Sequence, residues 1–391
     1  MPSSSKHPPP KVYANCYRTA EGVEPLARYG NNVYHQAEVI YSMLFAALSD
    51  KAAPAKIFWR MPLLPWSRGM LDMLRKPPFA SATQPPTYAE IVVGNTTRLP
   101  RLGCRPFGSR PPGQFFKTPA VARKVQRAVL QACGIRERIA PREPRSVVYM
   151  PRRGEGLQSK TWRNFADERA LLDALESAVP SAARRIRVVG TPSGSSPVCK
   201  QIELWHSTDV LLTPNGAHFV NAPFLAFGSV LLEGVPWGMR EYVGQAHITR
   251  WASGVHHLRL HSDRPPRSKE LIPFRHVGSE EECAASEMCR RKYRDRALLY
   301  VDASAMLQLL KPALALVRSG CRDAKNWKNA FGRTCADYAT PVPASQRGDK
   351  EKMSGGWCAA GKLKAEAKWA GGKSNGWPER NCCACGREAQ T

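Results

Sequence analysis

Short apolar runs alternate with amphipathic stretches from residue 141 to residue 320. The apolar runs lie at residues 146–150, 185–189, 209–213 and 230–233. Stretches with apolar residues at helical spacing lie between them, at 168–178 and 200–206, and a further one follows at 303–316. Buried strands that alternate with helices are typical of an α/β protein with a doubly wound parallel sheet. We therefore predict a lobe of the nucleotide-binding type over residues 141–320.

A second lobe is expected over residues 29–140, after a polar, proline-rich segment at 1–28. Within it, apolar residues at positions 37, 40, 41, 44, 45 and 48 follow the i, i+3, i+4 spacing of a helix face. Strand-like runs follow at 57–59 and 88–93. The first residues, MPSSSKHPPPK, do not read as a signal peptide, and no run reaches membrane-spanning length.

The most informative segment is 211–237, which reads LLTPNGAHFVNAPFLAFGSVLLEGVPW. It predicts a strand, a tight polar turn, a short helix over 217–225 and a second strand. In parallel sheets, ligands bind at the carboxyl ends of strands, where N–H groups at a helix start can hold phosphate. Asn215, Gly216, Ala217 and His218 occupy that place. Glu233 ends the next strand, where its carboxylate could accept hydrogen bonds from a ribose.

This segment resembles the C-terminal lobe of glycosyltransferase family 61, which includes plant xylosyl- and arabinosyltransferases and animal O-GlcNAc and O-mannose-extending enzymes. The family typically carries a loop HGAGLTN and a strand end viE-x-x-P, and here the chain reads NGAHFVN and LLEGVP. The Gly-Ala core, Asn221 and Glu233 are kept, whereas Asn215 replaces the usual histidine and His218 a small residue. The resemblance covers residues 29–262. It implies a GT-B fold, two Rossmann-like lobes facing an interdomain cleft, with these residues at the donor site.

Arginines follow the first strand of the predicted nucleotide-binding lobe. Arg152 and Arg153 come directly after 146–150, and Arg163 precedes Asn164, an arrangement similar to the family pattern strand-x-R … R-x-x-N-E-x-E-L. Guanidinium groups donate bidentately to phosphate oxygens. We expect these four residues to bind the donor diphosphate. The alternative is that the arginines are solvated surface residues of a basic chain.

The catalytic base has three candidates, His35, Glu38 and His218. The family commonly has an aromatic–histidine pair opening its first long helix, which Tyr34 and His35 match here. Such a histidine could act as a base toward an acceptor hydroxyl, or it could cap or pack against a neighbouring loop. No Asp-x-Asp occurs in residues 141–320. We therefore expect no metal site and no cofactor, with the leaving-group charge carried by arginines and a helix N-terminus.

The formal charge of +26 and the sequence pI of about 9.9 imply acidic partners. Nucleotide-sugars, anionic polysaccharides or glycoproteins, membrane surfaces and nucleic acids all fit that charge. The basic residues are spread along the chain, and no RNA-recognition, helix-turn-helix or zinc-finger signature is present. We therefore expect no specific nucleic-acid partner.

Six of the twelve cysteines lie in residues 321–391, namely Cys321, Cys335, Cys358, Cys382, Cys383 and Cys385. An even, dense set in a Gly- and Trp-rich tail predicts a disulfide module, with zinc as the alternative. The tail resembles a small cysteine-rich module of secreted proteins of algae and related protists, on its W-x-x-x-x-G-x-x-C-x-x-Y half and its terminal CCxCG. Cys283 and Cys289 are six residues apart in a segment that we expect to be a charged loop, and they could form another bridge. The four remaining cysteines, Cys16, Cys104, Cys133 and Cys199, either pair or stay thiols.

Together these features predict a metal-independent, inverting glycosyltransferase that moves a sugar from a UDP-sugar to a glycan or glycoprotein hydroxyl. The resemblance implies a Golgi or ER location. Membrane contact is then expected only through an N-terminal anchor missing from this sequence, and the alternative is an unusual route into the secretory pathway. Two alternatives stay open. A catalytically inactive relative could bind glycans, or the chain could be a basic extracellular matrix protein.

Overall fold

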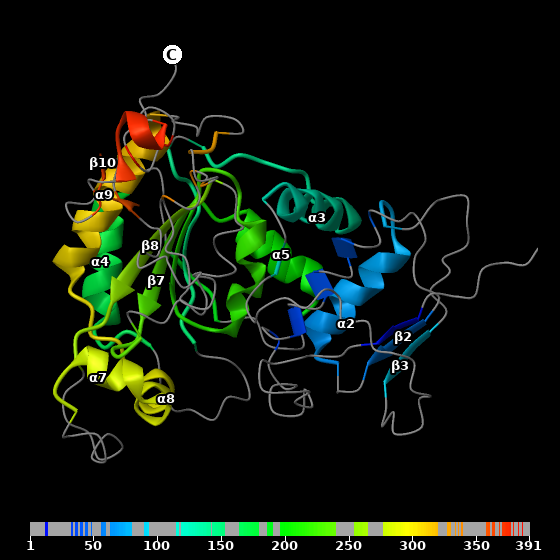
Figure 1. Cartoon of the computed structure of the whole chain (residues 1–391), viewed down its shortest axis with the longest axis horizontal. Helices are drawn as coiled ribbons and strands as arrows, with labels where there is room; N and C mark the ends of the chain where they lie inside the picture. Colours follow the sequence, from blue (N-terminus) through cyan, green and yellow to red (C-terminus); the bar gives the residue numbers. More distant parts are fainter. Residues whose placement is uncertain are drawn as a thin grey trace, which may run out of the picture. The chain divides into compact units, whose positions relative to one another are not determined.

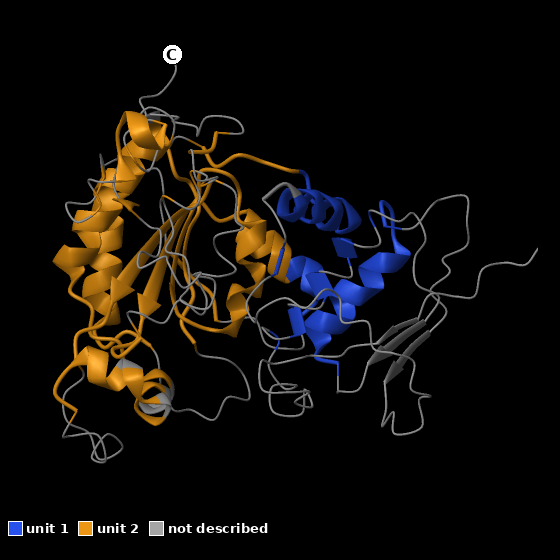
Figure 2. Cartoon of the chain, in the orientation of Figure 1, with its two compact units in different colours: residues 1–136, 194–200 blue, residues 137–193, 201–391 orange. Residues whose placement is uncertain are grey.

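The computed structural model of the protein describes residues 12–14, 56–59, 63–79, 90–93, 115–116, 119–141, 143–152, 164–179, 186–190, 196–239, 254–264 and 277–319, with parts of 33–48 and 327–385. The chain forms two compact units, shown in Figure 2. Unit 1 comprises residues 1–136 and 194–200, and unit 2 comprises residues 137–193 and 201–391.

Unit 2 contains a five-stranded, fully parallel sheet in the order β5-β4-β6-β7-β8. Its strands are β4 (Val147–Tyr149), β5 (Arg187–Val188), β6 (Val210–Pro214), β7 (Val230–Val235) and β8 (His256–His261). The chain runs from β4 outward to β5 and then returns past β4 to β6. This reversal is that of a doubly wound sheet, and it confirms the predicted α/β class for this lobe.

Helices cover both faces of this sheet (Figure 1). One face packs against α4 (Glu168–Ala178) and α9 (Ala303–Ser319), through a core made by alternate strand residues: Val210, Leu212, Val230 and Leu232 with Leu171, Leu175, Leu310 and Leu314. The other face carries α5 (Val198–His206) and the 3₁₀ helix η3 (Ala217–Phe224). Because successive strand residues point to opposite faces, burial on both sides explains why the strands read as continuous apolar runs.

The short helix expected over 217–225 is a 3₁₀ helix rather than an α-helix. Its bonds span three residues, as in Phe219 N to Gly216 O at 3.2 Å and Leu225 N to Ala222 O at 3.1 Å. Pro223 lies inside it and cannot donate, so a regular α-helical ladder would lose a bond there. The tighter helix keeps Asn221 fully buried.

Unit 1 holds the three-stranded parallel sheet β1-β2-β3, formed by β1 (Val12–Ala14), β2 (Lys56–Trp59) and β3 (Glu90–Val93). Its helices include α2 (Pro65–Asp72), η2 (Met73–Arg75) and α3 (Pro119–Ala132). The predicted strand at 57–59 is thus present, and the one predicted at 88–93 is present over 90–93, with residues 88 and 89 outside the described residues. The helix predicted over 37–48 buries Ala37, Ile40, Tyr41 and Leu44 completely. A disulfide joins Cys133 to Cys199 within this unit.

The segment around Cys283 and Cys289 was expected to be a charged loop, and this is wrong. It forms α7 (Glu280–Ala285) and α8 (Glu287–Arg296). Both helices start at a serine cap: Ser279 makes a capping box with Glu282, and the Ser286 side chain accepts from the Cys289 N–H. The serine caps therefore stabilise two helix starts in a segment whose many charged residues suggested a loop. The predicted Cys283–Cys289 disulfide is present.

The described part of the tail is a small core built around disulfides. Cys335 pairs with Cys382 and Cys358 with Cys385, beside the two-stranded ladder of β9 (Cys358–Ala359) and β10 (Lys362–Leu363). These bonds confirm the disulfide prediction for four of the tail cysteines and exclude those four as zinc ligands. Cys321 and Cys383 lie outside the described residues. None of the described helices is both long and apolar enough to cross a membrane.

Candidate functional site

The candidate site lies at the carboxyl edge of the unit 2 sheet, where the strand order reverses. Neighbouring strands β4 and β6 end there, followed by Arg152 and by the loop of Asn215 and Gly216. A Cβ atom placed on Gly216 would lie 3.6 Å from the Cζ atom of Arg152. Ligands of doubly wound sheets bind at this switch point. The fold therefore brings a guanidinium group and a glycine loop together where a phosphate is expected.

Gly216 is needed because the His218 ring lies directly against it. A Cβ atom at Gly216 would approach the His218 Nδ1 atom to 2.7 Å, closer than non-bonded atoms allow. The ring has little room to move, since His218 is only 8% exposed and its Nε2 lies 2.9 Å from the Thr213 hydroxyl. That hydroxyl donates to the Met150 carbonyl at 2.9 Å. It must therefore accept from His218, which assigns the imidazole proton to Nε2.

Glu233 lies beneath the loop as a buried carboxylate. Asn215 Nδ2 donates to its Oε1 at 2.5 Å, and His257 Nε2 lies 2.7 Å from its Oε2. Arg259 Nε is 3.9 Å from the same oxygen. Burial by itself raises the pKa of Glu233, but the hydrogen bonds from His257 and Asn215 and the charges of His257 and Arg259 outweigh it and hold the pKa below its ordinary value. The carboxylate is thus ionised and engaged with the loop.

Two buried amides fix the backbone around this edge. Asn164 Oδ1 accepts from the Arg152 N–H at 2.8 Å, and the Asn164 carbonyl accepts from the Leu299 N–H at 2.8 Å. Asn221 Nδ2 donates to Gln201 Oε1 at 3.3 Å, which ties the end of η3 to α5. Both amides hold neighbouring segments in place from inside the protein.

Seven of the residues predicted from the sequence come together at this edge: Arg152, Asn164, Asn215, Gly216, Ala217, His218 and Glu233. Asn221 lies further along η3. The other candidates, His35, Glu38, Arg153 and Arg163, lie outside the described residues. Sequence reasoning missed Thr213, His257 and Arg259. Strand alternation puts 257 and 259 on one face of β8, but only the register with β7 shows that this face meets Glu233.

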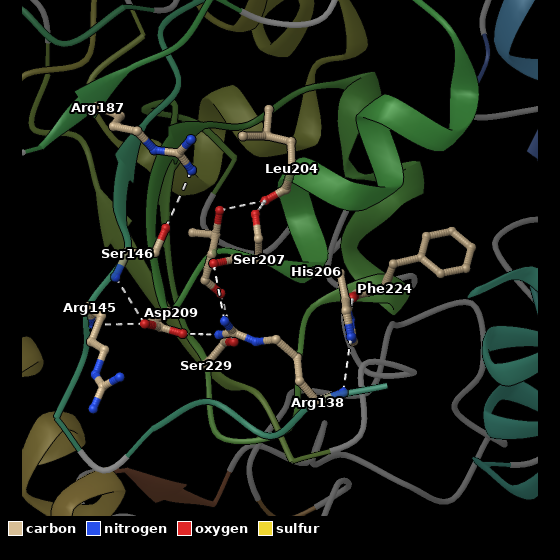
Figure 3. Close-up of polar contacts among 11 residues, drawn as sticks. Arg138, Arg145, Ser146, Arg187, Leu204, His206, Ser207, Asp209, Phe224 and Ser229 are labelled. Atoms are coloured by element: carbon tan, nitrogen blue, oxygen red, sulfur yellow. Dashed lines mark hydrogen bonds and ion pairs between the residues drawn. The ribbon is translucent and has the colours of Figure 1, made fainter. Parts of the chain in front are cut away.

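A second polar cluster lies at the opposite, amino edge of the same sheet (Figure 3). Asp209 is buried, forms an ion pair with Arg138, and accepts from the N–H groups of Arg145 and Ser146 at 2.7 and 2.9 Å. His206 accepts from the Arg138 N–H at its Nε2, so its Nδ1 donates to the Phe224 carbonyl. These bonds join the starts of β4 and β6 and hold the sheet from the edge away from the candidate site.

The parallel, doubly wound sheet makes unit 2 an α/β fold, a class in which ligands commonly bind at the switch point of the strand order. Residues 65–232 match the model of the family Glycosyltransferase 61. The match begins at α2 and ends inside β7, so it includes Arg152 and the Gly216 loop. A match to this family implies glycosyltransferase activity in general, with a nucleotide-sugar donor and a glycan acceptor. No curated protein matches the chain.

Proposed function

We propose that this protein transfers a sugar from a UDP-sugar to a hydroxyl group of a glycan or glycoprotein, without a metal ion and with inversion at the anomeric carbon. The observation that carries the proposal is the meeting of Arg152 with the Gly216 loop at the β4–β6 switch point. A diphosphate needs a cationic fork and close access to backbone N–H groups, and this edge offers both.

The proposed binding roles follow from the contacts at the edge. Arg152 donates to the diphosphate, and the N–H groups at the start of η3, at Ala217 and His218, donate beside it. Asn215, Glu233 and His257 act as positioning residues, because Glu233 is buried and its two oxygens hold the other two side chains. Arg153 and Arg163 would add further charge, and Asn164 keeps Arg152 in place through its backbone.

The proposed chemical step is a single displacement. The acceptor oxygen forms a bond to the anomeric carbon while the bond from that carbon to the diphosphate oxygen breaks. The diphosphate leaves with the electron pair, stabilised by arginine side chains, and a base takes the hydroxyl proton. His35, Glu38 and His218 are the candidate bases. His218 has its lone pair at Nδ1, since Nε2 donates to Thr213.

We also propose the GT-B arrangement, with an acceptor lobe at 29–140, a donor lobe at 141–320 and a disulfide module at 321–391. The parallel sheets of both units support the first part. Four disulfide bonds among the described cysteines support a protein that folds in an oxidising compartment, such as the Golgi or ER lumen.

The test is thermal stability of the oxidised full chain with UDP, other nucleotides and UDP-sugars, with and without EDTA. A UDP-dependent rise in Tm that survives EDTA, and is lost in Arg152→Ala and Arg163→Ala, supports the proposal. The matched control is Arg169→Ala, which removes an exposed arginine on α4 and should leave the rise intact. Stabilisation by no nucleotide, or stabilisation that needs a divalent ion, would contradict the proposal.

One observation favours a second candidate function. Asn215 stands where the family commonly has histidine, and its amide is engaged by buried Glu233. A loop without that histidine could bind a nucleotide-sugar or glycan without turning it over. Release of UDP from a UDP-sugar in the presence of acceptor separates the enzyme from such a binding protein. A basic matrix protein would bind no nucleotide at all.

A further inference from the structure

The net positive charge per residue is higher in unit 1 than in unit 2, because unit 1 has few acidic residues. This unit contains 20 Lys and Arg against 6 Asp and Glu, a formal charge of +14. Unit 2, which is longer, contains 38 Lys and Arg against 26 Asp and Glu, a formal charge of +12. Unit 1 therefore carries more than half of the net charge on about a third of the residues. A net positive charge attracts polyanions over several ångströms.

The exposed charged side chains that the structure describes in unit 1 also share one sign. Among its residues whose burial the structure describes, the one acidic side chain, Asp72, is half-buried, and the exposed charged residues are Arg68, Arg75, Lys76, Arg123, Lys124, Arg127, Arg136 and Lys200. We call this set the cationic surface of unit 1. It spans α2, η2, α3 and the segment that the Cys133–Cys199 disulfide attaches to the end of α3.

Helix α3 shows that this charge is not the usual mixed helix surface. Arg123 and Arg127 are one turn apart, a spacing at which like charges destabilise a helix, and α3 contains no acidic residue. Helix α4 of unit 2 is the contrast, because there Arg169 pairs with Asp173 at 2.9 Å. Helix α3 has no acidic residue of its own that could reduce this repulsion. An anionic ligand bound to the helix would reduce it.

We propose that the cationic surface of unit 1 binds a polyanionic glycan, carrying carboxylate or sulfate groups, as the acceptor of the transferred sugar. This inference rests on the proposed function and narrows its acceptor class. Nucleic acid is the other polyanion that such a surface could hold. The Cys133–Cys199 disulfide in the same unit favours a glycan, because stable disulfides belong to compartments without nucleic acid.

The experiment measures binding of the full oxidised chain to polygalacturonate, chondroitin sulfate, neutral dextran and a short single-stranded DNA, over a range of NaCl concentrations. Two double variants test the surface: Arg75→Gln with Lys76→Gln on η2, and Arg123→Gln with Lys124→Gln on α3. The matched control is Arg169→Gln with Lys311→Gln, which removes two exposed cations from unit 2. Circular dichroism of each variant verifies the fold, and a misfolded α3 variant leaves the η2 variant as the test.

We expect at least one of the two anionic glycans to bind more tightly than dextran and DNA. Each unit 1 variant should weaken that binding about tenfold and lower the slope of log Kd against log salt by about 1.5, by loss of counterion release. The control variant should change neither value. The preferred glycan distinguishes a carboxylated from a sulfated acceptor.

Three results would overturn the inference: equal losses in the control variant, equal affinity for dextran, or tighter binding of DNA. UDP-dependent stabilisation, measured on the same samples, reports on the donor site in unit 2. Retained UDP stabilisation without glycan binding would reject the polyanionic acceptor alone. Glycan binding without UDP stabilisation would keep the cationic surface as a binding site and reject the proposed enzyme.

Discussion

The Nε2 atom of His257 lies 2.7 Å from the Oε2 atom of Glu233, and the two side chains are 5% and 1% exposed. The second oxygen of Glu233 accepts from Asn215 at 2.5 Å. A residue of the edge strand β8 is therefore connected through one buried carboxylate to the loop that precedes η3. The position of the candidate phosphate loop therefore depends on a buried side-chain contact between β7 and β8.

The first prediction concerns this carboxylate. Glu233→Gln removes the charge that His257 and Arg259 face, so we expect a loss of about 3 kcal/mol in the free energy of unfolding. Urea unfolding measures it. Glu176→Gln, an exposed change on α4, is the control and should stay within about 0.5 kcal/mol. Equal effects of the two changes would show that Glu233 does not hold the loop.

The second prediction concerns Gly216. Gly216→Ala places a methyl group against the His218 ring, so we expect loss of UDP stabilisation and about 1–3 kcal/mol of overpacking. Adding His218→Ala should restore most of the stability, because the opposing ring is gone. Gly278→Ala is the matched control, since its new Cβ would lie 3.5 Å from Glu282 Oε2, an ordinary contact. UDP stabilisation that persists in Gly216→Ala would exclude the loop as the donor site.

The elements that come from local patterns were predictable from the sequence. The apolar runs at 146–150, 209–213 and 230–233 appear as β4, β6 and β7, and the glycine loop lies between the last two. Contacts that depend on pairing between distant segments were not. Leu231 pairs with His257 in the sheet, which brings His257 beside Glu233, and no periodicity reveals that register. The Cys133–Cys199 bridge, 66 residues apart, is the same kind of contact.

The third prediction concerns the amino edge of the sheet. Asp209→Asn removes the charge that pairs with Arg138 and leaves an amide NH2 group facing either Arg138 or the N–H groups of Arg145 and Ser146, so we expect about 3 kcal/mol of destabilisation. Asp173→Asn, which breaks an exposed pair with Arg169, should cost less than about 1 kcal/mol. The UDP affinity of folded Asp209→Asn should be unchanged because the site lies at the other edge. A large loss of affinity with intact fold would contradict this.

The fourth prediction concerns pH. Burial lowers the pKa of His256 to about 4, below the value of about 6.5 expected in the unfolded chain. Between these values the unfolded chain binds a proton that the folded protein does not, so stability should fall as the pH drops from 6.5 to 4. In His256→Asn this decline should be shallower. Urea midpoints measured across this range test it, and parallel curves for the two proteins would rule out His256 as the cause.

The last prediction concerns the tail. Its buried residues, including Tyr338, Trp357 and the disulfide cysteines, form a cluster of their own, separate from the core around the unit 2 sheet. Cys358→Ser with Cys385→Ser opens a bridge between residues 27 apart, which the chain-entropy relation values at about 3.5 kcal/mol. We therefore expect the tail to unfold at a lower temperature, while the main transition of unit 2 stays in place.

Calorimetry and the near-ultraviolet signal of the Tyr338 and Trp357 rings, which meet edge to face with centroids 4.8 Å apart, would follow the two events. The matched control is Cys283→Ser with Cys289→Ser, because that bridge spans only 6 residues and the same relation gives it about 2 kcal/mol. Loss of this bridge should destabilise the unit 2 cluster that contains Trp237 and Tyr293, and it should leave the near-ultraviolet signal of the tail unchanged. A single shared transition in both variants would mean that the tail and the sheet unfold together, against the separate cores seen here.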